Sequence, residues 1–211
     1  MKLTVFGATG ATGTQVTEQA LAAGHEVTAV VRSQSRLAIP AHPLLRVVTA
    51  DVMDADSIMP AVAGSDAVVT TIGPRGNGPT TIIEDSVRAI IAAMHKAGVR
   101  RLLMLSGSVT ADDGESWYMR YTVKPVARRT FLRHVCADMR AGEAQVRASG
   151  LDWTIVRPPA LTGKPAAGHY RTAVDRNLPH GFRVTRADLA ACVLALVDDP
   201  ASLRKHIGIA S

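Results

Sequence analysis

Short apolar runs alternate with amphipathic segments along most of the chain. The runs have the length of strands buried on both faces, whereas the segments between them repeat apolar residues every three or four positions, as helices do. Strands are predicted over residues 2–6, 25–31, 46–49, 67–72, 101–105, 151–156 and 206–209. Helices are predicted after Gly13, after Asp54, from Thr80 or Thr81 to near Gly98, and over residues 126–148 and 186–197.

This alternation predicts one α/β domain over residues 1–211, a three-layer doubly wound parallel sheet of the Rossmann type, because parallel strands need crossover helices. Two stretches break the pattern. Residues 106–125 are predicted to form a polar loop, and residues 157–185, with Gly, Pro and Asn, are predicted to contribute a small lid on the substrate side. Ligands in such sheets bind beyond the carboxyl ends of the strands, so a crevice is expected there.

Composition and charge narrow the class of protein. The formal net charge is +6, but the basic excess lies largely between Arg100 and Arg147, and no recognition-helix or zinc-finger pattern occurs, so no direct nucleic-acid binding is expected. Cys136 and Cys192 lack the spacing of metal ligands, which predicts no metal site and two reduced thiols. Without a signal peptide or a long apolar run, the chain is expected to be cytoplasmic and to have no membrane partner.

The glycine-rich turn after the first strand is the clearest functional motif. Gly7, Gly10 and Gly13 follow a strand and open a helix. Glycines at this spacing permit a tight turn, close approach of the backbone to a pyrophosphate, and close helix packing. The turn therefore predicts a dinucleotide site.

The end of the second predicted strand indicates which dinucleotide binds. Sheets that prefer NAD carry an acidic residue there, which hydrogen-bonds the ribose 2′-hydroxyl. This chain has Arg32 instead, with Ser35 and Arg36 close by, and a guanidinium suits a 2′-phosphate, so NADP(H) is favoured over NAD(H). Asp51 and Val52, after the third strand, either hold the adenine edge or belong to a turn that starts a helix.

Six segments together resemble a known superfamily. They are TVFGATGATG, AVVRSQSRL, ADV, AVVTTIGPRG, MLSGS and SGLDWTIVRPPALTG. They are similar to the atypical short-chain dehydrogenase/reductases, and within them to the NmrA-like NAD(P)H-binding group and to NADPH-dependent flavin reductases of the biliverdin reductase B type. The likeness spans nearly the whole chain.

The resemblance implies a set of cofactor contacts, several of which use backbone atoms. Those at the pyrophosphate would be Gly7, Thr9, Gly10, Ala11, Thr12 and Gly13. Arg32, Ser35 and Arg36 would meet the 2′-phosphate, Asp51 and Val52 the adenine, and Ile72 and Gly73 the ribose. Those around the nicotinamide would be Leu105, Ser106, Gly107, Pro158, Ala160 and Leu161.

The departures from the superfamily fall where catalysis would occur. Many of its enzymes use a YxxxK pair, in which Tyr is the general acid and Lys lowers its pKa. This chain has no such spacing: Tyr118 and Tyr121 stand in the wrong register to Lys124, and Val135 and Met139 align with the Tyr and Lys. The two tyrosines are therefore interpreted as lid or packing residues.

Ser106 remains the one weak catalytic candidate, as a donor to an acceptor carbonyl or to the carboxamide, the alternative being a structural role in the turn. By the resemblance, Gly107 and Ala160 replace an active-site Ser and a His of the biliverdin reductase B type, so that pocket is not reproduced. His169 and Tyr170 either form a substrate wall across the crevice or belong to a surface loop.

Three functions are consistent with these residues. The first is an NADPH-dependent reductase that passes hydride to a small-molecule acceptor such as a flavin or quinone, which can take its proton from water. The second is a non-catalytic NAD(P)H sensor of the NmrA type that acts on a protein partner. The third, an epimerase that retains NAD, is disfavoured because only 55 residues follow Val156.

Overall fold

A computed structural model describes residues 1–33, 37–74, 76, 78–111, 113–114, 117, 121–122, 124–130 and 132–211. Its main sheet has the strand order β3-β2-β1-β4-β5-β6-β10-β8. The strands are β1 (Lys2–Phe6), β2 (Glu26–Val31), β3 (Leu45–Thr49), β4 (Ala67–Thr70), β5 (Arg101–Leu105), β6 (Asp152–Arg157), β8 (Arg171–Val174) and β10 (Lys205–Ala210). All neighbours pair in parallel except β8, which is antiparallel to β10. The doubly wound α/β fold predicted from the sequence is confirmed.

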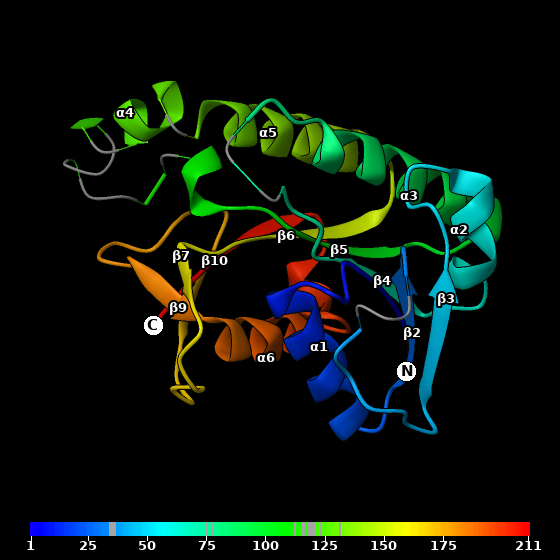
Figure 1. Ribbon diagram of the computed structural model, residues 1–211. Helices are drawn as coiled ribbons and strands as arrows, with labels where there is room; N and C mark the ends of the chain where they lie inside the picture. Colours follow the sequence, from blue (N-terminus) through cyan, green and yellow to red (C-terminus); the bar gives the residue numbers. More distant parts are fainter. Residues whose placement is uncertain are drawn as a thin grey trace.

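Helices cover both faces of this sheet (Figure 1). They are α1 (Ala11–Ala22), α2 (Ala55–Val62), α3 (Ile82–Ala97), α4 (Lys124–Arg129), α5 (Arg133–Ala148) and α6 (Arg186–Leu196). One core packs α2, α3 and α5 against one face, and a second core packs α1 and α6 against the other. Within β5, Leu102 and Met104 enter the first core and Leu103 the second, as the twofold alternation of strand side chains requires.

The predicted helix boundaries hold where capping chemistry is present. The Asp54 carboxylate accepts a hydrogen bond from the Asp56 N–H (3.0 Å) at the start of α2. Helix α3 ends at Gly98, whose φ of +69° lies in the left-handed region that favours glycine. No helix among the described residues is long and apolar enough to cross a membrane.

Three expectations are corrected. The helix predicted over residues 126–148 is two helices, α4 and α5. At the end of α4 the Thr130 hydroxyl donates a hydrogen bond to the Val126 carbonyl (2.7 Å), and such side-chain bonds compete with the backbone bonds of a helix. The sheet is not wholly parallel, because β8 joins its edge in the opposite sense. Residues 157–185 contain β8 and a parallel pair, β7 (Ala160–Thr162) and β9 (Arg183–Thr185), whose short length gave no apolar period.

Candidate cofactor site

The glycine turn is held in a shape that side chains would prevent. Gly7 has a φ of +82°, and a Cβ added there would lie 2.6 Å from Thr71 Oγ1. A Cβ on Gly13 would lie 2.2 Å from the Gly7 carbonyl oxygen. Thus Gly7 permits the reversal, and Gly13 lets α1 approach the turn, as the sequence motif predicts.

The first turn of α1 presents free backbone donors to this space. Its N-cap is Gly10, which has no side-chain oxygen to occupy the N–H groups, and no acidic residue lies in the first turn. A helix N-terminus of this kind attracts anions through its N–H groups and its dipole. The turn therefore fits the pyrophosphate of a dinucleotide.

A cavity of about 440 Å³ runs along the turn and the carboxyl ends of β1 to β4. It brings together eleven of the residues predicted from the sequence to contact the cofactor. They are Gly7, Thr9, Gly10, Ala11, Thr12, Arg32, Asp51, Val52, Ile72, Gly73 and Leu161. Sequence reasoning missed other lining residues, notably Met53, Thr71 and Arg186.

The part of the cavity next to β2 and β3, where the sequence predicts the adenosine end of the cofactor, contains Arg32. Arg32 is exposed at the end of β2 and has no hydrogen-bond or ion-pair partner among the described residues. Asp51 lines the cavity, and its carboxylate accepts a hydrogen bond from the Met53 N–H (3.0 Å). The carboxylate therefore takes part in the turn that precedes α2, as one of the two interpretations expected, and this turn forms part of the cavity wall. Ser35 and Arg36, also predicted to bind the 2′-phosphate, lie outside the described residues.

Gly13, also predicted, packs against the Gly7 carbonyl and does not line the cavity. The other five described residues belong to the opposite end of the crevice and do not line the cavity either. They are Leu105, Ser106, Gly107, Pro158 and Ala160. The Ser108 N–H donates to the Pro158 carbonyl (2.8 Å), which joins the loop after β5 to the loop after β6. A Cβ on Gly107 would lie 3.4 Å from Met139 Sδ, so α5 packs closely on this loop.

A buried carboxylate organises this end. Glu143, on α5, is 2% exposed and forms an ion pair with Arg157 at the end of β6 (2.5 Å). Its Oε1 also accepts hydrogen bonds from the hydroxyls of Ser106 (2.6 Å) and Thr110 (2.9 Å). Arg147 approaches its other oxygen at 3.4 Å. We call these residues the Glu143 cluster; it ties α5 to the ends of β5 and β6.

The protonation of Glu143 follows from these contacts. Burial by itself would raise the pKa of this carboxyl, but the hydrogen bonds from Arg157, Ser106 and Thr110 and the charge of Arg157 outweigh burial, so the pKa lies below its usual range. Glu143 is therefore ionised at neutral pH, and an ionised carboxylate only accepts hydrogen bonds.

Ser106 is consequently engaged in the fold. Its single hydroxyl proton goes to Glu143, and the residue is 7% exposed, so in this arrangement it donates nothing to the crevice. Lys124 is likewise buried, and its Nζ donates to the carbonyls of Ser108 and Ala111. Tyr121 is 67% exposed, and Tyr118 lies outside the described residues. The described residues thus offer no replacement for the YxxxK pair.

The loop that contains His169 is held against α6 rather than across the crevice. The Asp188 carboxylate accepts hydrogen bonds from the N–H groups of Ala167 (2.9 Å) and Gly168 (3.1 Å). Tyr170 packs against the core of α1 and α6. These contacts favour the surface-loop interpretation of this segment over a substrate wall at His169 and Tyr170.

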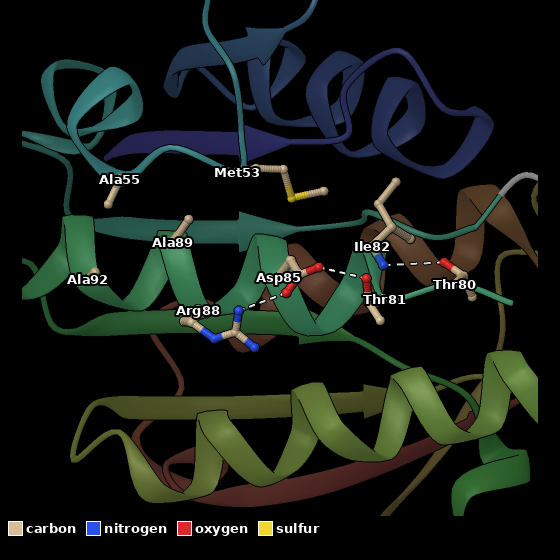
Figure 2. A pocket seen from close by; sticks show the side chains of 9 residues that line it. All are labelled: Met53, Ala55, Thr80, Thr81, Ile82, Asp85, Arg88, Ala89 and Ala92. Carbon is tan, nitrogen blue, oxygen red and sulfur yellow. Dashed lines mark hydrogen bonds and ion pairs between the residues drawn. The ribbon is translucent and has the colours of Figure 1, made fainter.

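A wider hollow of about 760 Å³ lies beside the adenosine end, between α3 and the start of α2, and shares Met53 and Ile82 with the cofactor cavity. Figure 2 shows that its polar groups pair with one another: Asp85 accepts from Thr81 (2.7 Å) and from Arg88 (2.7 Å). Because these groups satisfy each other, this hollow is the weaker candidate site.

Comparison with known families agrees with this geometry. A family model described as NAD(P)H-binding matches residues 7–200. The chain belongs to this NAD(P)H-binding family. Among its relatives, the UPF0659 protein YMR090W of Saccharomyces cerevisiae is 27% identical over 222 residues, which cover 99% of this chain and 92% of that protein.

Solved structures place the family member among oxidoreductase folds. ChuY, an anaerobillin reductase from Escherichia coli O157:H7, superposes with a TM-score of 0.79 at 26% identity and covers 100% of this chain and 97% of its own. A short-chain dehydrogenase/reductase from Veillonella parvula in complex with NADP has a TM-score of 0.83 at 17% identity, covering 100% and 94%. The family match confirms the NAD(P)H-binding family inferred from the sequence, and these two structures share its fold.

Proposed function

We propose that this family member is an NADPH-dependent oxidoreductase that passes hydride to a flavin, a quinone or a similar flat acceptor. The observation that carries the proposal is the cavity that joins the glycine turn to the unpaired Arg32. The turn suits any dinucleotide, whereas a guanidinium without a partner among the described residues, just after β2, favours one with a 2′-phosphate.

The residues of this chain would bind and orient the cofactor. Backbone N–H groups of Ala11 and Thr12, at the start of α1, would hold the pyrophosphate, and Arg32 the 2′-phosphate. The nicotinamide, when bound, supplies a hydride, that is, two electrons and one proton. An acceptor reduced by hydride takes its second proton from water, so the fold needs to provide orientation and not an acid.

Two features support a flat acceptor. The chain is similar to ChuY, an anaerobillin reductase, and bilins are extended conjugated molecules made of linked pyrrole rings. The nicotinamide end also lacks a free acid among the described residues, and such acceptors do not need one.

A second function is favoured by the same end of the crevice. Because Ser106, Lys124 and Glu143 satisfy one another or backbone carbonyls, the polar groups there serve the fold. A chain that binds NAD(P)H and reports its redox state to a protein partner would need no more than this. We therefore keep a non-catalytic sensor as the alternative.

The deciding experiment follows NADPH consumption by absorbance with purified protein and FMN, FAD, riboflavin, simple quinones or biliverdin. The reductase predicts turnover with at least one acceptor well above the rate without protein. Tight NADPH binding without turnover on any acceptor would contradict the reductase and support the sensor. No binding of either dinucleotide would contradict both.

A further inference from the structure

The charges that line the cofactor cavity are few and unevenly placed. Among the described lining residues, Arg32 and Arg186 are the cations and Asp51 is the acid. Arg32 and Asp51 follow the adjacent parallel strands β2 and β3, so both belong to the adenosine end. Arg186, at the start of α6, is the cation that the C-terminal third of the chain contributes to the same cavity.

Arg186 is placed by the contact between α6 and α1. It is the first residue of α6, and Gln19 on α1 donates a hydrogen bond to the carbonyl of the next residue, Ala187 (3.0 Å). Figure 1 shows α1 and α6 side by side on one face of the sheet. The glycine turn leads directly into α1, so the start of α6 lies against the helix whose N-terminus faces the cavity.

The carboxylate nearest in sequence does not neutralise Arg186. Asp188 is 2% exposed, and its two oxygens accept hydrogen bonds from Thr185, Ala167 and Gly168. Arg186 itself has no hydrogen-bond or ion-pair partner among the described residues. The same bonds fix the backbone at the start of α6, so Arg186 is part of the cavity wall in the absence of a ligand.

We propose that Arg186 binds the pyrophosphate of the dinucleotide, opposite the glycine turn. The inference rests on the proposed NAD(P)H site and adds to it a residue that sequence reasoning did not find. A pyrophosphate carries two negative charges, and the turn offers it only neutral N–H groups. Arg186 supplies the full positive charge that the turn lacks, whereas Arg32 serves the 2′-phosphate.

Substitution of each arginine should therefore weaken the binding of a different set of ligands. The test is isothermal titration calorimetry with NADPH, NADH and adenosine 2′-monophosphate, which has the 2′-phosphate and no pyrophosphate. For Arg186→Gln we expect about tenfold weaker binding of both dinucleotides, the size of one lost charge-assisted hydrogen bond, and unchanged binding of adenosine 2′-monophosphate. For Arg32→Gln we expect weaker NADPH and adenosine 2′-monophosphate, and unchanged NADH.

Arg183→Gln is the matched control, since Arg183 is an exposed arginine on β9, outside the described lining of the cavity. Thermal unfolding of each variant checks that the fold is kept, and Arg186→Lys should recover part of the lost affinity. Wild-type affinity for both dinucleotides in Arg186→Gln would overturn the inference, as would an equal loss for adenosine 2′-monophosphate. A wild-type chain that binds no dinucleotide would instead overturn the proposed function, and this inference with it.

Discussion

The two ends of the crevice differ in whether their charged side chains have partners within the fold. At the adenosine and phosphate end, Arg32 and Arg186 have no partner among the described residues. At the nicotinamide end, Glu143 is surrounded by Arg157, Ser106 and Thr110 and leaves none of them free. Unpaired cations favour a polyanionic ligand, whereas a satisfied buried cluster favours rigidity. Under the proposed reductase function, this difference means that the cofactor is recognised by charge and the acceptor by shape.

The strongest challenge to this comparison is removal of the central carboxylate. Glu143→Ala leaves Arg157, which is 12% exposed, without its partner. Breaking such a buried pair typically costs about 3–5 kcal/mol. We expect a loss of that size in the free energy of unfolding measured in urea. The control is Asp56→Asn, which removes an exposed ion pair with Lys96 and should cost less than about 1 kcal/mol.

At the opposite end, Arg32→Asp should affect ligand binding and not stability. The carboxylate would repel a 2′-phosphate, and we expect about 100-fold weaker NADPH binding, or roughly 2.7 kcal/mol, with a much smaller change for NADH. Fluorescence titration with each cofactor would measure this. Equal losses for the two cofactors would argue against the assignment of Arg32 to the 2′-phosphate.

Acid should weaken the Glu143 cluster. Because the pKa of Glu143 is lower in the folded chain, its stabilisation is present above the ordinary glutamate pKa of about 4.3 and is lost as the pH falls through the folded value. We expect the free energy of unfolding to fall more steeply below about pH 4.3 in the wild type than in Glu143→Gln. Parallel curves for the two proteins would contradict the assigned shift.

The smallest effect concerns Ser106. Ser106→Ala removes one of several hydrogen bonds to Glu143, so we expect about 1 kcal/mol less stability and, if the chain is a reductase, a kcat within about threefold of wild type. Thermal unfolding and steady-state kinetics would test both. A large fall in kcat with unchanged stability would restore Ser106 as a catalytic donor.

The sequence predicts the residues of the adenosine and phosphate end better than those of the nicotinamide end. Gly7, Gly10, Arg32 and Asp51 follow predicted strands, and parallel topology alone brings strand ends together. Arg186 escaped prediction because its approach depends on how α6 packs against α1, which no local pattern encodes.

The Glu143 cluster could not be predicted from the sequence for a similar reason. Glu143 and Arg157 lie on separate elements, α5 and β6, and their pairing is a property of packing. The helix boundaries were predictable at Asp54 and Gly98 because a cap acts within a few residues. The strands of residues 157–185 were not, since β7, β8 and β9 are too short to show a period.

The reversed edge strand has a consequence for the order of folding. Among the described strands, β8 pairs only with β10, which follows it in the chain, while β10 also pairs with β6. During synthesis, β1 to β6 emerge first and can form their sheet without any later residue. Residues 171–174 must wait until residues 207–210 have been made. The strands around the glycine turn can therefore pair before the sheet edge at β8 does, whereas the packing of α1 against α6 forms only after residues 186–196 have been made.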